Sequence, residues 1–173
     1  GFYTSPFEVI LSVESGIQQI YYTLDGSLPN VDSFLYSAPI YIDHTSVVRA
    51  VANSICTIEG VVTKSYFINE TSNLPIVSLT TDPYNLWDEE YGIYVMGNGA
   101  SAEFPYWGAN FWEDWERPVH IEFFEPSGHL GFSLNAGAKI FGGWNRGRPQ
   151  KSVAIYARSS YGISQINYQI FPD

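Results

Sequence analysis

The chain has 173 residues, a formal net charge of −10, 17% aromatic residues and a single cysteine, Cys56. This length can bury a sizeable core as one large or two small domains, and the aromatic share is too high for a disordered acidic chain. One cysteine excludes an intrachain disulfide framework, no apolar run approaches the roughly 20 residues of a membrane helix, and the acidity argues against nucleic acid as a partner.

The first 70 residues are predicted to form short strands joined by turns. Apolar and polar residues alternate over residues 7–13 and 20–24, which is the period-of-two pattern of a half-buried strand. Asp25-Gly26 follows as a turn, because glycine accepts a positive φ. Further strands are predicted at residues 40–42, 47–52 and 61–68. With no amphipathic helix between them, these strands predict a small β-sandwich over residues 1–70.

A second unit, residues 74–173, is predicted after a polar linker at residues 69–73. It begins with a strand at residues 74–79, and Asp82-Pro83 then provides the N-cap and first position of one helical turn. Residues 97–114 are predicted to be a long ordered loop. Further strands are expected at residues 119–123, 131–141 and 152–156, with a turn at residues 126–128. The predicted fold class is therefore mainly β.

The charges are divided unevenly along the chain. Residues 1–116 hold 2 basic and 15 acidic side chains, whereas residues 117–173 hold 6 basic and 3 acidic ones. No acidic residue lies between Pro126 and Pro172. This asymmetry indicates a local site for an anion in the second unit, despite the acidity of the whole chain.

Residues 142–152, Gly-Gly-Trp-Asn-Arg-Gly-Arg-Pro-Gln-Lys-Ser, are the best candidate for that site. Three glycines free backbone N–H groups and three cations stand within six residues, which suits a phosphate or another anion. The candidate residues are Gly142, Gly143, Arg146, Gly147, Arg148 and Lys151. A Walker A loop is excluded, because Arg148-Pro149 replaces its Lys-Ser/Thr pair and a strand is predicted where it requires a helix. The alternative is a glycine-rich turn whose cations pair with the acidic first part of the chain.

The acidic, aromatic stretch of residues 82–116 supports two other hypotheses. Residues 88–90, Asp-Glu-Glu, are candidates for calcium, but the spacing of a known calcium loop is absent and no metal ligand is predicted. Trp107, Trp112 and Trp115 offer flat apolar faces on which sugar rings could stack. Tryptophans buried in a small core would explain the same residues equally well.

Three strings in the first unit point to a known type of domain. They are Tyr-Thr-Leu-Asp-Gly-Ser-Leu-Pro at residues 22–29, Tyr-Ser-Ala-Pro-Ile at 36–40 and Val-Arg-Ala-Val-Ala at 48–52. By these strings, residues 1–68 resemble the chitobiase/β-hexosaminidase C-terminal type of immunoglobulin-like domain. The resemblance implies a non-catalytic accessory module of a secreted, often carbohydrate-active, protein.

Four strings in the second unit point to another family. They are Leu-Pro-Ile-Val-Ser-Leu-Thr-Thr-Asp-Pro at residues 74–83, Gly-Ile-Tyr-Val at 92–95, Trp-Glu-Arg-Pro-Val-His-Ile-Glu-Phe-Phe at 115–124 and the string at 142–152. By their order and spacing, residues 74–173 resemble the N-terminal part of a CotH-type (spore-coat protein H) kinase domain. The fold expected from the resemblance is an immunoglobulin-like β-sandwich followed by a β-rich (α+β), partial kinase-like region.

CotH-like proteins are atypical protein kinases that use ATP and a divalent metal, Mg²⁺ or Mn²⁺, on coat or envelope proteins. The resemblance implies that Lys151 and Arg146 contact nucleotide phosphates and that Gly142, Gly143 and Gly147 shape the loop. Phosphoryl transfer also needs carboxylates, and none lies between Pro126 and Pro172. We therefore expect a truncated, inactive piece of an exported protein, located at the cell envelope or outside the cell. The piece is expected to have no cofactor of its own. Its exposed sheet edges are expected to favour oligomers.

Two further hypotheses remain open. One is a non-catalytic cell-surface or carbohydrate-binding module that contacts a glycan through the aromatic loop 104–115. The other makes the sandwich a spacer that holds the second unit away from a cell surface.

Overall fold

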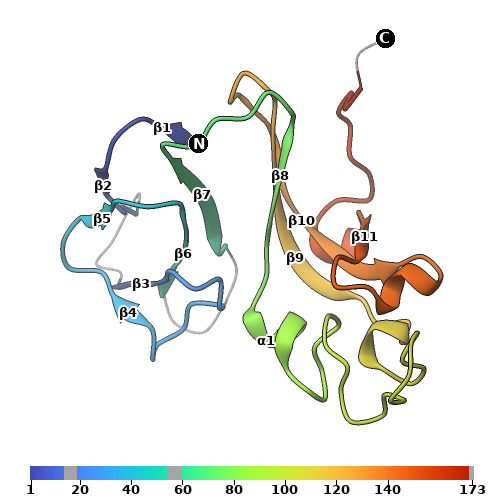
Figure 1. Cartoon of the computed structure of the whole chain (residues 1–173). Helices are drawn as coiled ribbons and strands as arrows, with labels where there is room; N and C mark the ends of the chain where they lie inside the picture. The colour runs from blue at the N-terminus through green and yellow to red at the C-terminus, as the bar shows by residue number, and fades with distance from the viewer. Residues whose placement is uncertain (14–18, 54–59, 172–173) are drawn as a thin grey trace. The chain divides into compact units, whose positions relative to one another are not determined.

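The computed structural model describes residues 1–13, 19–53 and 60–171, so Cys56 lies outside the described residues. Within these ranges the chain is mainly β, as its alternating patterns predict (Figure 1). The chain divides into two compact units: residues 1–80 with 122–133, and residues 81–121 with 134–173. None of the helices in the described ranges has the length and hydropathy of a membrane span.

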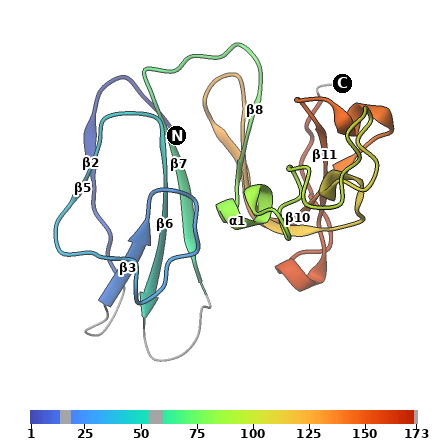
Figure 2. The same ribbon diagram turned by 60° about the horizontal axis from the view of Figure 1, so that its bottom comes forward.

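The described strands of the sandwich form a five-stranded and a two-stranded sheet. The larger sheet has the order β1-β7-β6-β3-β4, in which β1 runs parallel to β7 and the other neighbours are antiparallel. Its strands are β1 (Phe2–Tyr3), β3 (Gln19–Thr23), β4 (Phe34–Leu35), β6 (Ser46–Asn53) and β7 (Val62–Ile68). Figure 2 shows β3, β6 and β7 side by side. The smaller sheet pairs β2 (Phe7–Val9) with β5 (Ile40–Ile42).

Both sheets contribute to one apolar core. It contains Val9, Ile40, Ile42, Val48 and Ile68. The alternation along β5 explains this arrangement, because its first and third side chains are buried while the middle one is exposed. Two sheets that share a core make a small β-sandwich, which is the fold that the strand spacing predicts.

The strands of the sandwich differ from the predicted ones in two respects. The strand predicted over residues 7–13 ends at Val9, and Ile10 is exposed to solvent instead of continuing the ladder. The strands β1 and β4 are not predicted, because two residues are too few to show an alternating pattern. The turn at Asp25-Gly26 is confirmed, with Gly26 at a φ of 86°.

The remaining described strands form a four-stranded sheet of order β11-β10-β9-β8. Its strands are β8 (Ile76–Thr80), β9 (Arg117–Phe124), β10 (Leu130–Phe141) and β11 (Ser152–Tyr156). All four lie close to predicted positions, and β9 and β10 are the long curved pair in Figure 1. β11 pairs antiparallel with β10, so an extended strand follows the glycine-rich string where a Walker A loop would require a helix.

Strand β9 departs from simple alternation at Glu122. The pattern predicts His120 and Glu122 on one polar face, yet Glu122 is only 2% exposed. Its carboxylate accepts a hydrogen bond from the backbone N–H of Ser65 at 2.6 Å, and Lys64 Nζ lies 3.5 Å away. These partners belong to β7 of the same unit. A distant strand therefore compensates a buried carboxylate that the local pattern places at the surface.

Helix α1 (Pro83–Trp87) begins where the sequence predicts. The Asp82 carboxylate accepts the Tyr84 N–H at 2.9 Å, and Pro83 occupies a position where a missing N–H removes no helical bond. Residues 88–116 form a long loop that contains only the short 3₁₀-helix η1 (Asn110–Trp112). Ile93, Ala109 and Phe111 of this loop share a buried core with Ile140 of β10. The loop is thus an ordered part of the second unit.

Candidate functional site

The loop between β10 and β11, residues 142–151, contains all six residues that are predicted to bind phosphate; we call it the cationic loop. It starts at Gly142, whose φ of 114° favours glycine. It continues as the 3₁₀-helix η2 (Trp144–Gly147), in which the Arg146 N–H donates to the Gly143 carbonyl at 3.0 Å. The cationic loop is therefore a compact, hydrogen-bonded turn.

Its other two glycines have different surroundings. A Cβ added at Gly147 would lie 2.9 Å from the Pro105 carbonyl oxygen and 3.0 Å from the Phe104 ring. A Cβ added at Gly143 would have no neighbour within 4 Å. Gly147 thus allows the cationic loop to pack against residues 104–105, whereas Gly143 leaves the backbone open to an approaching ligand.

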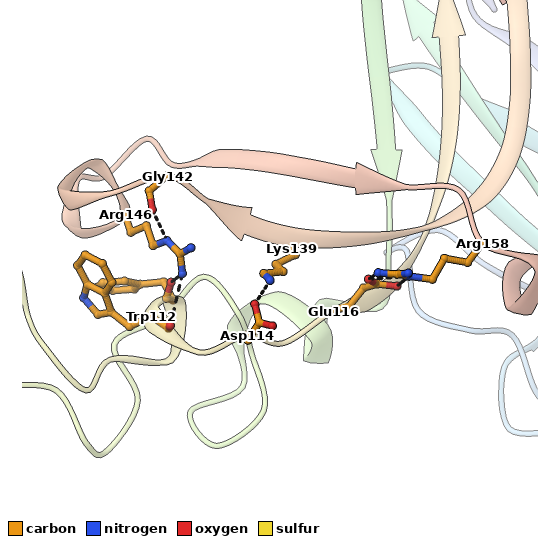
Figure 3. A network of polar contacts seen from close by, with 8 residues as sticks. Trp112, Asp114, Glu116, Lys139, Gly142, Arg146 and Arg158 are labelled. Carbon is orange, nitrogen blue, oxygen red and sulfur yellow. Dashed lines mark hydrogen bonds and ion pairs between the residues drawn. The ribbon is translucent and has the colours of Figure 1, made fainter. Parts of the chain in front are cut away.

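Arg146 turns back onto the backbone of the protein (Figure 3). Its Nε donates to the Gly142 carbonyl at 2.7 Å, and Nη1 donates to the carbonyls of Phe111 and Trp112 at 3.4 and 3.3 Å. The guanidinium carbon also lies 5.7 Å from the centroid of the Trp112 ring. Arg146 therefore ties the cationic loop to residues 111–112.

Arg148 and Lys151 keep donors that no carboxylate uses. Arg148 is exposed, and within the described residues its guanidinium has no hydrogen bond or ion pair. Lys151 Nζ donates one hydrogen bond, to the Arg148 carbonyl at 2.8 Å, and lies 4.1 Å from the centroid of the Phe111 ring. Burial lowers the pKa of the Lys151 ammonium group below its usual value. Since an ammonium has three donors, two remain for a ligand.

Two other cations of the second unit are paired with carboxylates (Figure 3). Lys139 pairs with Asp114. Arg158 donates to both carboxylate oxygens of Glu116 at 2.7–3.0 Å, which lowers the pKa of Glu116. In the described ranges no ion pair joins Arg146, Arg148 or Lys151 to a carboxylate. Pairing with the acidic first part of the chain thus accounts for Lys139 and Arg158, but not for the cationic loop.

Two residues that hold this region are missed by the sequence analysis. The Tyr94 hydroxyl donates to the Pro149 carbonyl and accepts the Lys151 N–H, both at 3.1 Å. The buried Asn110 side chain donates to the carbonyls of Glu89 and Gly92 at 2.9 and 3.0 Å. No short-range pattern marks these roles, because the partners lie far away in the sequence. The only signal is that Tyr94 belongs to the Gly-Ile-Tyr-Val string at residues 92–95.

The aromatic loop 104–115 presents its three tryptophans differently. Trp107 is 54% exposed, and its ring centroid lies 4.2 Å from that of Trp112. Trp112 is half-buried and donates Nε1–H to the Pro105 carbonyl at 2.9 Å. Trp115 is half-buried, and the Arg117 guanidinium carbon lies 4.9 Å from the centroid of the Trp115 ring. Of these three side chains, Trp107 alone offers a largely exposed ring.

Two further exposed rings lie on the cationic loop and on the segment packed against it. Phe104 is 46% exposed and Trp144 is 65% exposed. Their rings meet edge to face, with centroids 6.2 Å apart. Phe104 lies at the start of the predicted aromatic loop 104–115, whereas Trp144 lies outside it.

Residues 88–90, the candidates for calcium binding, form a local turn. The Asp88 carboxylate accepts the N–H groups of Glu90 and Tyr91, both at 2.9 Å. In the part of the chain that the structure describes, no group of three His, Cys, Asp or Glu side chains is placed to hold a metal ion.

The described residues define a protein with a β-sandwich module and a second β-rich unit that presents a cationic loop. Residues 1–59 match the family model of the chitobiase/beta-hexosaminidase C-terminal domain. This match agrees with the resemblance stated for residues 1–68 and lies within the first unit. Searches of the curated proteins and of the solved structures give no significant match.

Proposed function

We propose that the cationic loop binds the phosphate groups of a nucleotide, in an exported CotH-like protein kinase located at the cell envelope or outside the cell. The observation that carries this proposal is the set of unused donors on Arg148 and Lys151. Cations whose charge is already balanced by a carboxylate gain less from a phosphate than cations without such a partner. In this unit the paired cations, Lys139 and Arg158, provide the contrast.

The residues of the cationic loop would have different roles in binding the phosphate. The planar Arg148 guanidinium can donate two parallel hydrogen bonds to a phosphate, and the Lys151 ammonium can contribute its two remaining donors. Gly143 leaves room for the anion to approach the backbone. Arg146 would act mainly by holding the loop in place, because backbone carbonyls already occupy much of its guanidinium.

The resemblance to CotH-like kinases extends the proposal to ATP as the nucleotide and to coat or envelope proteins as substrates. The donor set of the cationic loop fits a phosphate. The described residues offer no cluster that fits a divalent metal, so we derive no step through Mg²⁺ or Mn²⁺. Polyphosphate binding is the activity proposed for this chain, and phosphoryl transfer is proposed only for the intact CotH-like protein.

Calorimetric titration with sodium tripolyphosphate tests this proposal. We expect Arg148→Met and Lys151→Met each to weaken binding about tenfold, because each removes a charge-assisted hydrogen-bond donor. The matched control is Lys139→Met, which removes an equal charge that is already paired with Asp114. Binding by the control should stay within about twofold of wild type. Absence of binding by the wild type, or equal weakening by all three variants, would contradict the proposal.

The exposed rings favour a second candidate, binding of a glycan. Trp107, Trp144 and Phe104 are 46–65% exposed, and exposed aromatic faces suit the apolar side of a sugar ring. Affinity electrophoresis on soluble polysaccharides would show retardation of the wild type that is lost in Trp107→Ala or Trp144→Ala. Tyr41→Ala, which removes an exposed ring from the first unit, is the control. No retardation of the wild type would exclude this candidate for the polysaccharides tested.

A further inference from the structure

We propose that Tyr94 is the positioning residue of the cationic loop, fixing the backbone and the ammonium group of Lys151 for the anion. The inference rests on the proposed polyphosphate binding. Tyr94 acts through Lys151 and Pro149, whose backbone groups its hydroxyl contacts.

The Tyr94 hydroxyl bridges the last turn of the cationic loop. It accepts the Lys151 N–H at 3.1 Å and donates to the Pro149 carbonyl at 3.1 Å. The pairing of β11 with β10 begins one residue later, at Ser152 opposite Phe141. Lys151 therefore lies just outside the ladder, and the hydroxyl group binds its N–H there.

The Tyr94 ring takes part in a second contact, with the Lys151 side chain. Lys151 Nζ lies 5.2 Å from the centroid of the Tyr94 ring and 4.1 Å from that of Phe111. An ammonium near aromatic faces is attracted by their quadrupoles. One residue thus restrains both the backbone and the charged end of Lys151.

Contacts outside the cationic loop hold Tyr94 in place. Its backbone N–H donates to the Leu86 carbonyl at 3.0 Å, at the end of α1. The Trp87 ring packs against its own ring, with centroids 5.2 Å apart. Its neighbour Ile93 belongs to the buried core of the unit. The position of Tyr94 is therefore set independently of the cationic loop.

This arrangement has a consequence for affinity. A loop that is already held in its binding geometry loses less conformational entropy when a ligand binds. Removing only the hydroxyl group would release residues 149–151 while leaving the ring, Lys151 and Arg148 in the protein. The variant Tyr94→Phe should therefore weaken anion binding although it removes no charge and no aromatic ring.

The test compares Tyr94→Phe and Tyr94→Leu with a control, Tyr84→Phe. Tyr84 lies on α1, the helix whose Leu86 carbonyl accepts the Tyr94 N–H, and its ring stacks on Tyr91 with centroids 5.0 Å apart. We expect tripolyphosphate to bind Tyr94→Phe about three- to tenfold more weakly than wild type, as loss of one net hydrogen bond implies. Tyr94→Leu should bind still more weakly, because it also loses the ring. Tyr84→Phe should bind as the wild type does.

Amide hydrogen exchange provides a readout that is specific to the hydroxyl group. In Tyr94→Phe the Lys151 amide should exchange about tenfold faster, because its acceptor is gone. The Asn110 amide, which donates to the Met96 carbonyl, should be unchanged and so show that the unit is folded. In Tyr84→Phe both amides should exchange as in the wild type.

The outcomes separate this inference from the proposed function. If the wild type does not bind tripolyphosphate, the proposed function fails and the inference with it. If the wild type binds but Tyr94→Phe binds equally well, or its Lys151 amide exchanges at the wild-type rate, the inference alone is overturned.

Discussion

Replacing Phe111 by alanine is expected to lower the free energy of unfolding of the second unit by about 3–5 kcal/mol. Phe111 is 2% exposed and packs in one core with Ile93, Ala109 and Ile140. Truncation removes a whole ring from this core and leaves a cavity that the surrounding loop can fill only in part. Urea unfolding, followed by NMR at the amide of Ile140, measures the change.

Phe141→Ala is the matched control for this prediction. The Phe141 side chain is exposed at the end of β10, so its loss should change the free energy of unfolding by less than about 0.5 kcal/mol. Because the Phe111 ring also contacts Lys151, Phe111→Ala should weaken tripolyphosphate binding, whereas Phe141→Ala should not. A loss of less than about 1 kcal/mol for Phe111→Ala would show that this core does not hold the long loop.

The second large effect concerns Arg49 in the sandwich. Arg49→Met is expected to lower the free energy of unfolding of the sandwich by about 2–3 kcal/mol. The buried Arg49 guanidinium donates to the Gly26 carbonyl at 2.8 Å and to the Thr63 hydroxyl at 3.3 Å. The substitution leaves both acceptors without these donors. Urea unfolding read at the amide of Ala50 on β6 measures the cost.

Arg49→Lys serves as the comparison, because it keeps the charge but not the forked geometry of the guanidinium. The free energy of unfolding of Arg49→Lys should lie between that of the wild type and that of Arg49→Met. If Arg49→Met is as stable as the wild type, the hydrogen bonds that link β6 to the Asp25-Gly26 turn do not contribute to the stability of the sandwich.

Much of the fold could be predicted from the sequence because most of its strands carry their own pattern. Strands β3, β5 and β11 lie at or within one residue of their predicted positions, and Asp82-Pro83 marks the start of α1 through purely local chemistry. The two-residue strands β1 and β4 could not be predicted in this way. Their pairing depends on partners far along the chain, such as Phe67 opposite Phe2.

The burial of Glu122 shows the same limit for a side chain. Alternation within β9 assigns this carboxylate to a polar face, because nothing nearby in the sequence shows that another strand will cover it. Its hydrogen-bond donor, the N–H of Ser65, is 57 positions away. The local pattern predicts the strand and its apolar face, but it does not show that a distant strand also covers the carboxylate on its polar face.

For the candidate site, the sequence identified the loop but not the roles of its cations. Glycine spacing and clustered charge select residues 142–152 as the candidate. The separation of paired from unpaired cations depends on contacts such as Glu116 with Arg158, which are 42 positions apart. The role of Tyr94 likewise depends on a contact across 57 positions. Such partners become visible only when the chain is folded.

The central claim is that Arg148 and Lys151 place the anion on the cationic loop, and NMR chemical-shift mapping with tripolyphosphate tests it most directly. At about 50 mM NaCl, where surface charges are only partly screened, the largest amide shifts are predicted at Gly143, Gly147, Arg148 and Lys151. These shifts should shrink in Arg148→Met and Lys151→Met but not in Lys139→Met. Shifts absent from residues 142–151, or confined to the first unit, would contradict the account.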